Sequence, residues 1–100
     1  MAVAEITVSP SGVGPSVSAY VARAEEVIRR HPRVKSMLTP MSTILEGDLD
    51  DILALTREVH NCMFGEGVQR VYTTLRIDER RDKALTMEGK LRSVESRLSG

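Results

Sequence analysis

The sequence predicts a single α+β domain in which an antiparallel four-stranded sheet carries two helices on one face. Its 100 residues are enough for one domain with one hydrophobic core. Segments in which apolar and polar residues alternate, as in half-buried strands, occur near both ends of the chain. Two stretches with apolar residues at helical spacing lie between them, which gives the order of elements discussed below.

The first strand is expected at Ala2 to Ser9, where every second residue from Ala4 onward is apolar. A loop rich in proline and glycine follows. A helix is then expected up to about Arg30, with Ser16 or Ser18 as its cap. It ends before Pro32, because a proline disfavours the helical conformation of the residue that precedes it.

This first helix has an apolar stripe and a charged side. Glu25 and Arg29 are four residues apart, as are Glu26 and Arg30, with the acid first. That order of charges is favourable on a solvated helix face, so we expect both acids to be exposed. The apolar stripe consists of Val17, Tyr20, Val21, Ala24, Val27 and Ile28.

The middle of the chain predicts two short strands and a second helix. The strands are expected at Val34 to Leu38 and at Met41 to Glu46, although the second does not alternate cleanly. Asp48 is the expected cap of the second helix. Gly65-Glu66-Gly67 is expected to stop it. Its stripe is Leu49, Ile52, Leu53, Thr56, Val59, His60 and Met63.

A last strand is expected at Arg70 to Asp78 and a third helix at about Met87 to Leu98. The order β-α-β-β-α-β with right-handed crossovers is the ferredoxin-like arrangement. Both main helices then cover one face of the sheet and leave the other face open. The residues expected on the open face are Glu5, Thr7, Tyr72, Thr74 and Arg76. So many neutral polar groups indicate that this face is either exposed to solvent or covered by a partner, and we favour a partner.

The composition narrows the function classes. The 14 basic residues balance the 14 acidic ones, which argues against a nucleic-acid partner and removes one barrier to self-association. Cys62 is the single cysteine, so neither an intrachain disulfide nor a cysteine metal cluster is expected. The N-terminus lacks the pattern of a signal peptide and no stretch is long enough to span a bilayer, which predicts a cytoplasmic protein without membrane contact.

Three segments resemble a known family. Glu5–Gly12, Pro40–Gly47 and above all Arg70–Asp82 are similar to the thiamine-binding protein family, which is related to YkoF-type binders of hydroxymethylpyrimidine and thiamine. The similarity extends from about residue 3 to residue 98. Two positions depart from it: Ser42 stands where the family usually has glycine, and Ala84 where proline is common.

The resemblance implies a ferredoxin-like fold and a homo-oligomer, a dimer or tetramer, that binds thiamine or its pyrimidine moiety near a subunit interface. Neither a cofactor, a metal nor a catalytic residue is implied. A cationic ligand with an aminopyrimidine ring needs a carboxylate, hydrogen-bond partners and an apolar wall. The residues expected to supply them are Glu5, Thr7, Thr43, Glu46, Tyr72 and Thr74.

Several alternatives stay open at this point. Glu5 could form an ion pair with Arg76 in place of a ligand contact, and Glu46 could favour the N-terminus of the second helix. His60, on the expected buried side of its helix, is interpreted as a hydrogen-bonded core residue. An RNA-binding module shares this order of elements but needs aromatic residues that the first and third strands lack. A small enzyme of the dimeric α+β barrel kind, and a structural or regulatory oligomer that binds another metabolite, are the other two candidates.

Overall fold

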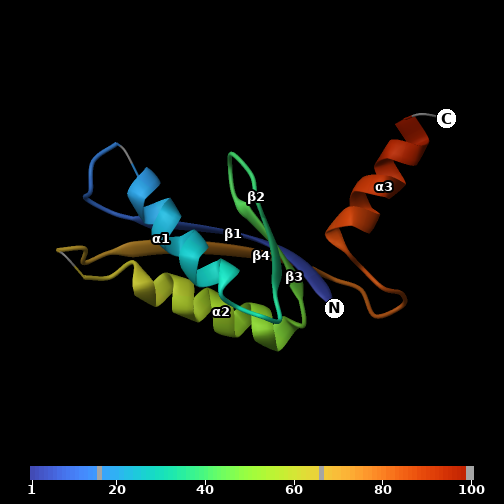
Figure 1. Ribbon diagram of the computed structural model, residues 1–100, viewed down its shortest axis with the longest axis horizontal. Coiled ribbons are helices and arrows are strands. Elements are labelled where there is room, and N and C mark those ends of the chain that lie inside the picture. Colours follow the sequence, from blue (N-terminus) through green and yellow to red (C-terminus); the bar gives the residue numbers. More distant parts are fainter. Residues whose placement is uncertain (16, 66, 99–100) are drawn as a thin grey trace.

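The computed structural model describes residues 1–15, 17–65 and 67–98 (Figure 1). Its elements follow the predicted order: β1 (Ala2–Pro10), α1 (Ser18–Arg29), β2 (Lys35–Leu38), β3 (Thr43–Gly47), α2 (Leu49–Cys62), β4 (Val71–Glu79) and α3 (Met87–Leu98).

The four strands form one antiparallel sheet in the order β2-β3-β1-β4. With α1 and α2 on one face of the sheet, this is the predicted ferredoxin-like arrangement (Figure 1). β4 pairs with β1 along its whole length, from Ala2 to Pro10. β3 pairs with β1 only from Ala2 to Ile6. The far end of β1 therefore has a strand on one side only.

The core lies between the sheet and the two helices. It is built from alternate residues of β1, from Leu45 on β3 and from one face of α2, where Ile52, Leu55 and Val59 are fully buried. Leu55 was not part of the stripe predicted for α2, whereas Leu53, which was, is 46% exposed. The buried face of α2 is thus rotated slightly from the predicted one.

The helix caps differ in part from those expected. The cap residue of α1 is Val17, and Ser18 is the first residue of the helix, so the prediction of Ser18 as the cap is wrong. Ser16 and Glu66 lie outside the described residues. Asp48 occupies the cap position of α2 as predicted, but its side chain makes no capping hydrogen bond. Gly65 and Gly67, which follow that helix, both have positive φ angles of the kind that glycine adopts at no steric cost.

The other face of the sheet is covered only at one end, where α3 begins. Leu85 and Met87 pack there on Val3 and Ile44. From this point α3 extends away from the sheet (Figure 1), and its side chains after Met87 are mostly exposed. Among the described helices, none has the length and apolar character needed to cross a bilayer.

Candidate functional site

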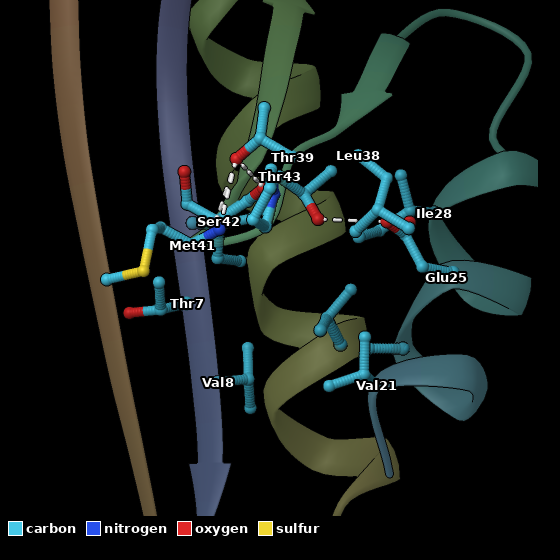
Figure 2. Close-up of a pocket in the computed structure, with 14 residues that line it drawn as sticks. Thr7, Val8, Val21, Glu25, Ile28, Leu38, Thr39, Met41, Ser42 and Thr43 are labelled. Atoms are coloured by element: carbon cyan, nitrogen blue, oxygen red, sulfur yellow. Dashed lines mark hydrogen bonds between the residues drawn. The ribbon is translucent and has the colours of Figure 1, made fainter. Parts of the chain in front are cut away.

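A cavity of about 150 Å³ opens beside the end of β1 that β3 leaves unpaired. Figure 2 shows its setting between β1, α1, the β2–β3 connection and α2. Its apolar wall includes Ile6, Val8, Val21, Ile28 and Val59. The cavity exists because β3 stops at Thr43 while β1 continues for several residues beyond the partner of Thr43. The connection between β2 and β3 passes over this gap without filling it.

Glu25 of α1 lines this cavity and is 6% exposed. Its Oε1 accepts a hydrogen bond from the Thr43 hydroxyl at 3.0 Å, drawn as a dashed line in Figure 2. Its Oε2 is buried and has no hydrogen-bond partner among the described residues. A buried carboxylate oxygen without a partner is costly. The sequence-based expectation that Glu25 lies on a solvated face is therefore wrong.

A signal for the burial of Glu25 was present in the sequence. Val21, Glu25 and Ile28 are spaced by four and then three residues, so they share one side of a helix. The i,i+4 pairing of Glu25 with Arg29 instead predicts a solvated position for the acid. In the folded chain, the packing of α1 against the sheet buries the side of the helix that carries Glu25 and Ile28.

Three hydroxyl groups of the cavity lining, those of Thr39, Ser42 and Thr43, have acceptors within the protein. Thr39 donates to the backbone oxygen of Ser42 at 2.7 Å and accepts from the Ser42 N–H at 3.1 Å. Ser42 donates to Oε2 of Glu5 at 3.1 Å, and Thr43 donates to Glu25. The hydroxyl protons of these three side chains are thus already used in hydrogen bonds within the protein.

The Ser42 hydrogen bond connects the cavity with the open face of the sheet. Glu5 lies on that face, and its Oε1 is 3.0 Å from a guanidinium nitrogen of Arg76, the residue opposite Glu5 in the register of β1 and β4. The ion pair that was one of two alternatives for Glu5 is therefore formed. A shallow second depression, lined by Glu5, Arg76, Asp78 and Lys90 among others, surrounds it.

The structure brings only some of the predicted site residues together. Thr7 and Thr43 both line the cavity. Glu46 lies at the other end of β3, where its Oε1 accepts a hydrogen bond from the Met87 N–H at 2.8 Å. Thr74 is on the open face opposite Thr7 in the register. Tyr72, one register pair further along the same face, is 53% exposed and carries the Arg70 guanidinium over its ring.

His60 and Cys62, near the end of α2, show no sign of a second site. Nδ1 of His60 is 2.6 Å from the Thr73 hydroxyl, and its ring meets Phe64 edge to face. Burial raises the pKa of the Cys62 thiol above its ordinary value, which disfavours the reactive thiolate. Within the described part of the chain, His, Cys, Asp and Glu side chains form no group that could hold a metal ion.

Comparison with known proteins supports one family. Residues 4–95 match the family described as thiamine-binding protein. A Bacillus subtilis UPF0045 protein, YqgV, is 43% identical over 102 residues, which cover 98% of each chain. The crystal structure of the Methanocaldococcus jannaschii protein MJ1052 superposes with a TM-score of 0.85 at 43% identity, over 94% of this chain and 95% of that one.

A more distant structure shares the fold alone. It is a Thermotoga maritima protein that was provisionally assigned to thiamine biosynthesis or salvage. It superposes with a TM-score of 0.79 at 22% identity, over 93% of this chain and 97% of that one.

Proposed function

This chain belongs to the thiamine-binding protein family, and on that premise we propose that it is a non-enzymatic protein that binds thiamine or its hydroxymethylpyrimidine moiety, near a subunit interface of a homo-oligomer. The provisional assignment of the Thermotoga maritima protein to thiamine biosynthesis or salvage is consistent with this ligand. A cytoplasmic location is part of the proposal.

The observation that carries the proposal is the buried carboxylate of Glu25 in the cavity between α1 and β1. Its Oε2 has no hydrogen-bond partner among the described residues and almost no accessible surface, so a ligand N–H group would satisfy it once the Glu25 side chain rotates toward the cavity. Small-molecule sites are typically apolar pockets with a few converging polar groups, which describes this cavity. We therefore place the ligand here, with Thr43 beside it and Thr7 at the edge where the cavity meets the open face.

The remaining predicted contacts are on or near the open face. Glu5 accepts a hydrogen bond from Ser42, which lines the cavity. A change at Glu5 is therefore expected to affect binding indirectly. Tyr72, Thr74 and Glu46 do not line the cavity. In this proposal they contact the ligand only if it extends over the open face or is shared with another subunit.

The homo-oligomer is supported by an apolar stripe on α3. Leu91, Val94 and Leu98 lie on one side of this helix and are 52%, 57% and 80% exposed. A short helix of this kind is marginal in water without packing. The formal net charge of zero does not oppose contact between copies. Light scattering should show a mass above that of one chain, which Leu91→Glu reduces and Ser93→Glu, a matched change off the stripe, leaves unchanged.

The ligand is tested by calorimetry with thiamine, hydroxymethylpyrimidine and thiamine phosphate. We expect saturable binding to the wild type and to Glu26→Gln, an exposed neighbour that loses the same charge. Glu25→Gln should weaken binding strongly. If Glu5→Ala abolishes binding and Glu25→Gln does not, the ligand lies on the open face. The absence of heat from all three compounds, with a folded wild type, would overturn the proposal and favour another metabolite.

A further inference from the structure

β4 forms one edge of the sheet along its whole length of nine residues. It pairs with β1 on one side, and among the described residues no strand pairs with its other side. The opposite edge, β2, has only four residues and carries the exposed Lys35. Short length, lysine, proline and bulges protect an edge strand from other chains. β4 has neither lysine nor proline, and its register with β1 runs without a bulge, so this edge is open to another strand.

The register identifies the backbone groups that β4 leaves free. The Ser11 N–H donates to the carbonyl oxygen of Arg70 at 2.8 Å, directly beyond the last register pair, Pro10 and Val71. Hydrogen-bonded and non-hydrogen-bonded pairs alternate along an antiparallel ladder. Pro10 and Val71 therefore form a non-hydrogen-bonded pair, which suits a proline because it has no N–H. The N–H and C=O groups that point away from β1 include those of Val71, Thr73, Leu75 and Ile77.

The side chains of these four residues are incompletely covered. They share the face of the sheet on which Leu75 packs against the core. Ile77 is 40% exposed and the other three are half-buried, whereas Ala4 and Ile6, which lie opposite Ile77 and Leu75 on β1, are buried. A strand added beside β4 would cover this apolar margin together with the free backbone groups.

A second copy of β4, placed antiparallel along this edge, matches it in a register centred on Thr74. On the open face, Tyr72 then lies opposite Arg76 of the other copy, and Arg70 lies opposite Asp78. The first pair joins a cation to an aromatic ring, and the second joins opposite charges. On the covered face the residues that meet are threonine or apolar: Thr73 with Leu75, and Val71 with Ile77.

Neighbouring registers are less favourable. A register centred one residue earlier sets Arg70 against Arg76, and like charges directly opposite each other are destabilising. A register centred one residue later sets the apolar Val71 against Glu79. The side chains of β4 therefore favour one register over its neighbours.

We propose that two copies of this chain join through their β4 strands, antiparallel and centred on Thr74, so that their two sheets become one continuous sheet. Each strand then supplies partners for the free N–H and C=O groups of the other. The twofold symmetry closes this contact after two chains, so β4 offers no site to a third copy. The inference rests on the homo-oligomer of the proposed function and adds a surface separate from α3.

Amide exchange measured by NMR tests the pairing. In one chain the amides of the even-numbered residues from 72 to 78 are bonded to β1, whereas those of Thr73, Leu75 and Ile77 face away from it. At high protein concentration the second group should exchange about tenfold or more slowly than when unpaired, and dilution should remove this protection. Protection that persists at the mass of a single chain would overturn the inference.

A cross-link tests the register in a Cys62→Ser background. Thr74→Cys should give a disulfide-linked dimer with oxidised glutathione, because opposite residues of a non-hydrogen-bonded pair have Cα atoms about 4.5 Å apart. Ser9→Cys is the matched control, exposed on the same face but one strand further from the edge, and should stay reduced. Cross-linking of Ser9→Cys, or of Leu75→Cys in preference to Thr74→Cys, would overturn the register.

Ile77→Pro removes one outward N–H without removing a bond to β1. In sedimentation it should raise the dimer dissociation constant about tenfold or more relative to Ile77→Ala, which keeps the N–H. Equal constants for the two variants would contradict the pairing. If the mass exceeds that of one chain while the outward amides stay unprotected, the inference fails and the homo-oligomer stands. A single-chain mass at every concentration would overturn both.

Discussion

The two faces of the sheet place polar side chains in opposite environments, one buried and one exposed to solvent. On the face that α1 and α2 cover, packing excludes water, and Glu25, the one buried carboxylate among the residues that the structure describes, lines a cavity. On the open face, Glu5, Arg76, Asp78 and Lys90 are at least partly exposed and form ion pairs. Exposed ion pairs cost little and contribute little. A polar group therefore indicates function more strongly on the covered face than on the open one.

The largest expected effect separates the covered face from α3. Leu45→Ala removes a side chain that is fully buried between sheet and helices, and should lower the free energy of unfolding by about 2–5 kcal/mol. The same change at Leu91, which is exposed on α3, should alter it by about 0.5 kcal/mol or less in the monomer. Urea denaturation of both variants measures the difference. Equal losses would contradict the distinction between the two regions.

A smaller effect is expected where α3 is attached to the open face. Glu46→Ala removes the charged acceptor of the Met87 N–H, a hydrogen bond worth about 1.5–3 kcal/mol. The amides in the first turn of α3 should then exchange faster with solvent, while those of α2 keep their protection. Glu46→Gln keeps an uncharged acceptor and should lose less. Faster exchange throughout the chain would show that the contact supports the whole fold.

The attachment of α3 should also depend on pH. The hydrogen bond and charge of Lys35 hold the pKa of Glu88 below its ordinary value of 4.5. A carboxyl whose pKa is lower in the folded state stabilises that state above its ordinary pKa, and this contribution is lost as the pH falls through the folded pKa.

We therefore expect the amides of α3, corrected for intrinsic rates, to lose protection below about pH 4.5 before those of the core. Lys35→Met should remove the part of this dependence that Glu88 causes. Added salt should act in the same direction as acid, because the pair is exposed. An α3 that stays protected in acid would mean that Leu85 and Met87 hold it without help from the ion pairs.

The smallest effect is expected at Glu5. Glu5→Ala removes the ion pair with Arg76, whose side chain is 81% exposed, and the hydrogen bond from Ser42. The free energy of unfolding should fall by less than about 1 kcal/mol. Thermal denaturation in parallel with the Leu45→Ala variant provides the scale. A loss comparable to that of Leu45→Ala would show that the network is as important as the core.

The sequence predicted the fold well because local patterns determine it. The alternation in β1 and β4 placed Glu5, Thr7, Thr74 and Arg76 on the face where the register has them. It failed at Glu25, whose burial and hydrogen bond with Thr43 it did not indicate, for a physical reason. Their pairing joins α1 to β3 across a long stretch of chain, and a charge at i,i+4 spacing suggested a closer partner for the acid. The cavity depends on where β3 ends, which propensities do not determine.

The short length of β3 has a consequence for how such a site could be altered. The cavity lies beside the end of β1, where β3 is too short to pair with it. It is not a void within the hydrophobic core. Lengthening the β2–β3 hairpin by one pair of residues would extend the ladder along β1 and fill that space. Each residue pair added to the β3–β1 ladder would therefore reduce the volume that is left for a ligand.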